Sequence, residues 1–184
     1  MRILGVTASS LFFPPTKSYD LIETAILASN AANITFDVSN FTTEYKHLQI
    51  RGVGRVTSST NIRALDIRFN GDTGANYSGH IVIGDGAIYS GGSANITNAG
   101  GFYITGNGSP SGAFGAGTID ILDAFSTTKF KTVRTLGGQT GYNIMNFSSS
   151  AWRNTNPITT IQIYPQASEI FGTDTRFSIY GIKG

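Results

Sequence analysis

Few side chains in this chain of 184 residues could support acid–base or nucleophilic chemistry: there are two histidines and eleven acidic residues. A serine nucleophile needs a sharp turn beside a histidine, and no Gly-x-Ser-x-Gly motif marks one of the many serines. Asp120 and Asp123 are three positions apart, which on a strand turns them to opposite faces and disfavours a paired general acid and base. His47 and His80 lie on predicted strands without a partner motif. The sequence offers no catalytic residue, and we expect that the protein is not an enzyme.

Oxygen ligands for a cation could come from the loops. Asp66, Asp72 and Asp85, with Asn70 and Asn76, could converge on a calcium ion. Asp and Asn at such positions more often satisfy the backbone groups of turns. The chain has no cysteine for a thiolate site and no nucleotide-binding or EF-hand motif. We therefore expect no metal and no cofactor.

Exposed aromatic rings could stack on a sugar. The candidates are Tyr77, Tyr89, Tyr103 and Trp152, the only tryptophan. A single tryptophan beside a strand more commonly closes the end of a core, so both roles remain open for Trp152.

Positive charge gives no indication of nucleic-acid binding. The net charge is +2, and on a strand Lys129 and Lys131 share one face while Arg134 points to the other. The commoner explanation is a solvated strand face or ion pairs with neighbours. No apolar stretch is long enough to span a membrane, so we expect neither nucleic acid nor membrane as a partner.

The elements that carry these residues are predicted to be strands. Leu48 and Ile50 alternate with polar residues, and so do Leu65, Ile67 and Phe69. Further strand patterns cover residues 20–28, 33–38, 80–83, 102–105, 118–122, 130–136, 142–147, 158–164 and 176–182.

Short strands separated by turn signals indicate an all-β fold, a jelly-roll-like antiparallel β-sandwich. The turn signals are Asn70-Gly71, Asp85-Gly86, Gly91-Gly92, Gly100-Gly101, Asn107-Gly108 and Gly137-Gly138. Residues 84–117 are rich in glycine and serine, and we expect long surface loops there with one short strand.

The N-terminal segment is predicted to be an extended arm. Residues 1–19 contain Phe12, Phe13, Pro14 and Pro15, and two consecutive prolines block a helix and favour extended backbone. Ser9, Ser10 and the prolines interrupt the apolar run, which disfavours a signal peptide. Residues 20–184 are predicted to form one sandwich domain, and arms of this kind often reach onto a neighbouring subunit.

Six segments resemble, in order, a family of small structural proteins of tailed-bacteriophage particles. They are YKHLQIRG (45–52), IRFNGDTGANY (67–77), STTKFKTVR (126–134), AWRNT (151–155), ITTIQI (158–163) and FSIYGIK (177–183). The resemblance covers residues 20–184 and is weakest over 84–117. It implies a jelly-roll sandwich without catalytic residues, in which 70–77 is a structured turn, Trp152 a core plug, and Arg51 and Arg68 interface or edge partners.

The resemblance leads us to expect a virion protein, most simply a capsid decoration or cement protein. Its partners would be copies of itself, as a homotrimer, and the major capsid protein or other virion proteins. Phe12, Phe13, Pro14 and Pro15 would contact adjacent subunits. The alternative is a tail or fibre module that binds host glycans through Tyr77, Tyr89 or Trp152.

Overall fold

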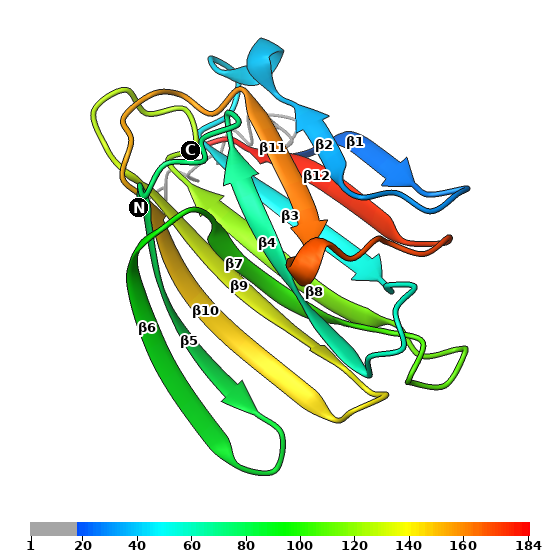
Figure 1. Ribbon diagram of the computed structural model, residues 1–184. Coiled ribbons are helices and arrows are strands. Elements are labelled where there is room, and N and C mark those ends of the chain that lie inside the picture. Colours follow the sequence, from blue (N-terminus) through cyan, green and yellow to red (C-terminus); the bar gives the residue numbers. More distant parts are fainter. Residues whose placement is uncertain (1–17) are drawn as a thin grey trace, which may run out of the picture.

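Twelve strands make up almost all the regular structure in residues 18–184, the part of the chain that the computed structural model describes (Figure 1). They are β1 (Tyr19–Ile26), β2 (Ile34–Asp37), β3 (His47–Gly54), β4 (Ile62–Phe69), β5 (Tyr77–Gly84), β6 (Ile88–Ile96), β7 (Ala99–Thr105), β8 (Gly115–Leu122), β9 (Lys131–Gln139), β10 (Ile144–Trp152), β11 (Thr160–Pro165) and β12 (Arg176–Ile182). Two three-residue helical turns, η1 (Ser39–Phe41) and η2 (Gln166–Ser168), accompany them. The predicted all-β class is confirmed.

The strand order is that of a jelly roll with two additional hairpins. An eight-stranded antiparallel sheet, β1-β12-β3-β8-β9-β10-β5-β6, packs against a four-stranded sheet, β2-β11-β4-β7. The quartets β1-β12-β3-β8 and β2-β11-β4-β7 form the two facing sheets of the jelly roll. The hairpins β5–β6 and β9–β10 are inserted between its strands and widen only the larger sheet, with β6 at its far edge (Figure 1).

Alternating side chains build the core between the two sheets. Leu48 and Ile50 on β3 are fully buried, as are Ile67 and Phe69 on β4. The two strands belong to opposite sheets, so their apolar sides face each other across the sandwich. The predicted alternation is confirmed for the core side. On the other side of β4, Asp66 is only 7% exposed, because Asn98 and Gln166 cover and hydrogen-bond its carboxylate.

The prediction of long loops over residues 84–117 is wrong. The segment contains β6, β7 and the start of β8. Three glycine pairs interpreted as turns lie inside strands β6, β7 and β9. Gly137 shows why: a Cβ atom there would fall 2.3 Å from Cβ of Phe102, so glycine makes room for a core ring. The predicted turn at Asn70-Gly71 is confirmed, and the φ angles of these two residues are 52° and 66°.

Side chains of the larger sheet close the free edge of β7. Asn146 Oδ1 accepts a hydrogen bond from the N–H of Tyr103 at 3.2 Å, and its Nδ2 donates to the carbonyl of Gly101 at 3.3 Å. Ser150 Oγ accepts from the N–H of Gly100 at 3.2 Å. The inner positions of β10 are therefore polar because they replace the missing neighbour strand of β7.

The first strand begins one residue before the expected domain boundary, at Tyr19. The predicted contact residues Phe12, Phe13, Pro14 and Pro15 lie outside the described residues.

Candidate functional site

Exposed apolar side chains gather on the outer face of the larger sheet, the face turned away from the smaller sheet. They come from the two inserted hairpins: Leu136, Met145, Phe147, Val82 and Ile88 are 52%, 57%, 46%, 47% and 86% exposed. Leu136 lies opposite Phe147, and Phe147 opposite Val82. Met145 and Ile88 both lie opposite Gly84, one row along. These five side chains form one continuous surface, the apolar outer patch.

The size and composition of the apolar outer patch set it apart from ordinary surface. Its exposed fractions correspond to roughly 600 Å², the upper end of the largest apolar patches on monomeric proteins. Strands β6 and β10 contain no charged residue. Charged side chains are a common device for keeping sheet surfaces apart, so this face is suited to contact with another protein.

A shallow hollow of about 820 Å³ adjoins the patch on the same face, where small residues line β3, β8 and β9. Arg51, one of the predicted interface residues, borders it. Its guanidinium carbon lies 5.3 Å and 5.4 Å from the ring centroids of Tyr19 and Tyr180. Arg51 is exposed on this outer face, and the two rings hold its orientation, while its interface role stays a prediction.

Arg68 is instead directed to a partner within the chain. It donates to the hydroxyl of Tyr164 at 2.9 Å, and its guanidinium carbon lies 5.0 Å from that ring centroid. The side chain is half-buried on β4 and supports the smaller sheet.

The predicted surface roles of Tyr77 and Trp152 are wrong, because both side chains are fully buried. Their ring centroids lie 6.2 Å and 5.5 Å from that of Phe69 and 6.3 Å from each other. Trp152 Nε1 donates to Asp72 Oδ2 at 2.8 Å, and the Tyr77 hydroxyl accepts from the N–H of Phe69 at 3.1 Å. Burial raises the pKa of Tyr77 to about 12. Trp152 is thus the core plug, and neither ring can stack on a sugar.

Asp72 organises the turn that leads into this aromatic corner. Besides the indole of Trp152, it accepts hydrogen bonds from the N–H of Gly74 at 2.8 Å and from Asn76 Nδ2 at 3.0 Å. Burial opposes ionisation, but these donors outweigh it and hold the pKa of Asp72 below its ordinary value. The expectation of a structured turn over 70–77 is confirmed by these bonds.

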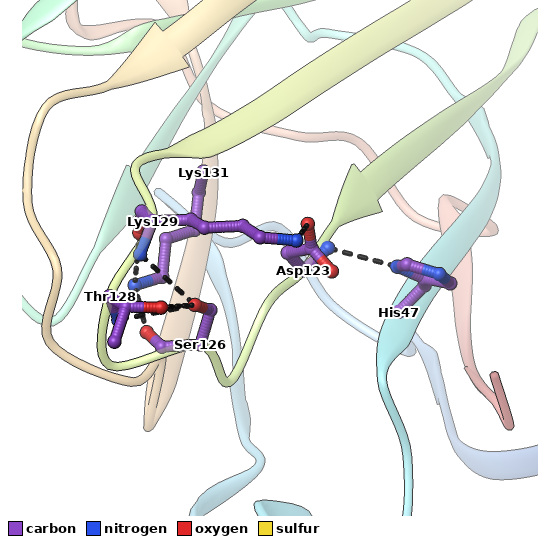
Figure 2. A network of polar contacts seen from close by, with 6 residues as sticks. All are labelled: His47, Asp123, Ser126, Thr128, Lys129 and Lys131. Carbon is purple, nitrogen blue, oxygen red and sulfur yellow. Dashed lines mark hydrogen bonds and ion pairs between the residues drawn. The ribbon is translucent and has the colours of Figure 1, made fainter.

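A histidine, an aspartate and a serine lie near the turn between β8 and β9, and Figure 2 shows His47 on one side of Asp123 and Ser126 on the other. His47 Nδ1 accepts the backbone N–H of Asp123 at 2.9 Å, while the Asp123 carboxylate binds Lys129 Nζ at 2.9 Å. Ser126 Oγ accepts the N–H groups of Thr128 and Lys129. The histidine contacts neither the carboxylate nor the serine hydroxyl, so this is not the charge-relay geometry of a hydrolase. It is a network that holds the β8–β9 turn.

The prediction of a solvated basic face is wrong for Lys131. Its side chain is fully buried, and Nζ donates to the carbonyls of Ser126 at 2.6 Å and of Lys129 and Asn154 at 3.3 Å. Nζ also lies 5.7 Å from the ring centroid of Trp152. Burial lowers the pKa of Lys131. The other part of the prediction is confirmed, because Lys129 forms an ion pair with Asp123.

The aspartates considered for calcium do not converge. Asp66 binds two amides and Asp72 the aromatic corner. Across residues 18–184 no three His, Asp or Glu side chains gather where they could hold a metal ion.

Comparisons with known proteins found no matching family model, curated protein or solved structure. The resemblance to phage virion proteins therefore stays a prediction. Within the described part of the chain, no helix has the length and apolar character needed to span a bilayer.

The residues of the apolar outer patch were not predicted as a site. In β10 the usual arrangement of polar and apolar side chains is reversed: Met145 and Phe147 point outward, whereas Asn146 and Ser148 point inward. Alternation alone places the apolar side of a strand in the core. The correct facing of β10 could be predicted only by knowing that its polar side pairs with the free edge of β7.

Proposed function

We propose that this chain is a structural protein of a tailed-bacteriophage particle, most simply a decoration or cement protein of the capsid. The observation that supports an adhesive role is the apolar outer patch on the β9–β10 and β5–β6 hairpins, two of whose strands, β6 and β10, contain no charged residue. The ordered resemblance over residues 20–184 supports the particle as the location.

The proposed mechanism is burial of this patch against another protein surface. Counting both partners, the contact covers about 1,200 Å², which is the low end of stable protein–protein interfaces. The cost of association consumes much of such a gain, so one contact holds weakly. Symmetric repetition on a particle raises the effective concentration and multiplies many weak contacts into firm attachment.

The proposed partners are copies of this chain, as a homotrimer, and the major capsid protein. Residues 1–19, with Phe12, Phe13, Pro14 and Pro15, would lie over adjacent subunits and add a second contact. Deleting residues 1–19 tests this part: truncated protein that coats undecorated heads to the same occupancy would remove the arm from the mechanism.

The patch is tested by the double variant Phe147→Ser, Met145→Ser. Both side chains are about half exposed, so the monomer should unfold at nearly the same urea concentration as the wild type. We expect occupancy on undecorated heads, and self-association by light scattering, to fall at least tenfold. Leu21→Ser is the matched control, because Leu21 is 59% exposed on β1, outside the patch. Unchanged occupancy in the double variant would exclude the patch as the adhesive face.

Copy number in purified particles tests the location. Hundreds of copies per particle would support the capsid, and a few or dozens the tail. Absence from purified particles would refute the proposal.

A further inference from the structure

A second hollow lies on the inner side of the β5–β6 hairpin, where the larger sheet passes the edge of β7. Its volume is about 260 Å³, and its lining includes Tyr89, Asn98, Gln166, Ser148 and Ser150. The side chains of the apolar outer patch point to the opposite face of the same hairpins. The hollow is therefore a separate site, and what it binds does not depend on what the patch contacts.

Glycines form the floor of this hollow and leave one aromatic ring free. Tyr89 is 61% exposed, and its side chain lies along β6 above Gly91. A Cβ atom at position 91 would fall 2.7 Å from the Tyr89 hydroxyl oxygen and 3.2 Å from the nearest ring carbon, so only glycine lets the ring lie there. Gly79 and Gly100 line the same hollow. The result is a flat apolar platform beside a polar wall.

The polar wall has a fixed orientation, which Asp66 imposes. Its carboxylate accepts from Asn98 Nδ2 at 2.9 Å and from Gln166 Nε2 at 2.8 Å. An ionised carboxylate only accepts, so both amides must turn their nitrogen atoms toward Asp66 and their oxygen atoms away from it. The two amide oxygens are held as acceptors before any ligand arrives. Such preorganisation lowers the entropic cost of binding a partner rich in hydroxyl groups.

The charges of the wall select against ionic ligands. No Lys or Arg lines the hollow among the described residues, His80 is its one basic lining residue, and its one carboxylate already accepts two hydrogen bonds. Phosphate, sulfate and acidic sugars would face the carboxylate of Asp66, and Arg68, the cation that attracts this carboxylate, does not line the hollow. The volume is below the roughly 300–1,000 Å³ of pockets that enclose drug-sized ligands, which suits a single ring.

We propose that this hollow, the Tyr89 cleft, binds one ring of a neutral saccharide. The apolar face of the sugar stacks on Tyr89, and its hydroxyl groups donate to the amide oxygens of Asn98 and Gln166. Ser148 and Ser150 contribute less, because their hydroxyls already bind Gly100.

The test is a titration of the ¹⁵N-labelled full-length protein with glucose, galactose and N-acetylglucosamine, with glycerol as the non-cyclic control. The amide signals of Gly79, Gly91 and Gly100 report directly on the floor of the cleft. We expect saturable shifts of these signals with at least one sugar and none with glycerol. No saturable shift with any of the three sugars would overturn the proposal.

Two variants with matched controls locate the binding. Tyr89→Ala removes the platform, and Gly91→Ala displaces it while keeping the ring, so each should weaken binding at least about tenfold. Tyr142→Ala, at a tyrosine 47% exposed outside the cleft, and Gly84→Ala, whose Cβ would have only a 3.6 Å contact with Met145, should bind as the wild type does. Equal binding by Tyr89→Ala and wild type would also overturn it. Loss of binding in this assay leaves the particle-occupancy assay of the Phe147 and Met145 variant unaffected, so the two proposals fail separately.

Discussion

Replacing Asp72 with alanine should destabilise the protein through the indole that Asp72 binds. Trp152 is fully buried, and its Nε1 donates to Asp72 Oδ2 at 2.8 Å. Without the carboxylate this buried N–H has no acceptor, which costs about 1–3 kcal/mol. Gly74 and Asn76 lose a shared acceptor too, but both are exposed to water and add little. We expect a total loss of about 2–3 kcal/mol.

The loss can be measured at the site itself, because Trp152 is the only tryptophan. Urea unfolding followed by tryptophan fluorescence should show a lower midpoint at an unchanged slope. For a chain of this length, about 2–3 kcal/mol corresponds to a fall of roughly 5–10 °C in Tm. Asp85→Ala is the matched control, since Asp85 is exposed in a turn and accepts only one N–H, at 3.4 Å.

A double-mutant cycle with Trp152→Phe, followed by circular dichroism, isolates the bond from the rest of the turn. The phenylalanine side chain has no N–H, so Asp72→Ala should cost about 1–2 kcal/mol less in that background.

The pH dependence of stability provides a further check. The folded pKa of Asp72 is below its ordinary 3.8, so its contribution is complete above that value and is lost as the pH falls through the folded pKa. Wild type and Asp72→Ala should therefore converge in acid. The reasoning is wrong if Asp72→Ala and Asp85→Ala unfold at the same urea concentration. It is also wrong if the losses of unfolding free energy from Asp72→Ala and Trp152→Phe simply add in the double variant.

Three further changes have expected outcomes. Gly137→Ala should cost about 1–3 kcal/mol by overpacking its aromatic neighbour across the core, whereas Gly84→Ala should be neutral in the same thermal unfolding assay. Lys131→Met should cost at least about 2 kcal/mol in urea, since three carbonyls lose their donor, and Lys129→Met much less; equal losses would contradict the buried role. Hydrogen bonds and an arginine neighbour outweigh burial and lower the pKa of Glu169, so stability should decline as the pH falls below the ordinary 4.5. Glu169→Gln should remove that share of the decline, and an identical pH profile would contradict the assignment.

The fold class could be predicted from the sequence because local alternation and turn chemistry agree over most of the chain. Leu48, Ile50, Ile67 and Phe69 alternate as core residues do, and all are buried. The sheet to which each strand belongs could not be predicted. That choice depends on pairings such as Tyr19 with Ile182, which no local pattern encodes.

The glycine-rich segment misled the prediction for a physical reason. Glycine is a turn signal when it supplies a positive φ, as at Gly71, but it also occurs where a neighbouring group comes too close for a Cβ atom. Gly91 and Gly137 are of the second kind. The two cases look identical in one sequence, because the ring near Gly137 comes from Phe102 on another strand and the direction of the Tyr89 ring near Gly91 depends on the packing.

The candidate surfaces depend on whether each side chain points to solvent or into the core, and the sequence predicts this only in part. An aromatic ring makes Tyr89, Tyr77 and Trp152 equal candidates in the sequence, but Tyr89 is exposed and the other two are buried. Residue type gives the chemistry of a ring, and only the packing shows whether a ligand can reach it.

The position of β12 has a consequence for how this protein is made. Strand β12 leaves the ribosome after the other eleven described strands, and it lies between β1 and β3, pairing with both. Until it is synthesised, two long strands of the larger sheet have no neighbour at that position, and the nascent chain cannot complete its jelly roll. The hairpins β5–β6 and β9–β10 pair within themselves and can form earlier, since their closing turns are short. The widened end of the sheet is thus free to fold during translation, while closure of the opposite end waits for β12.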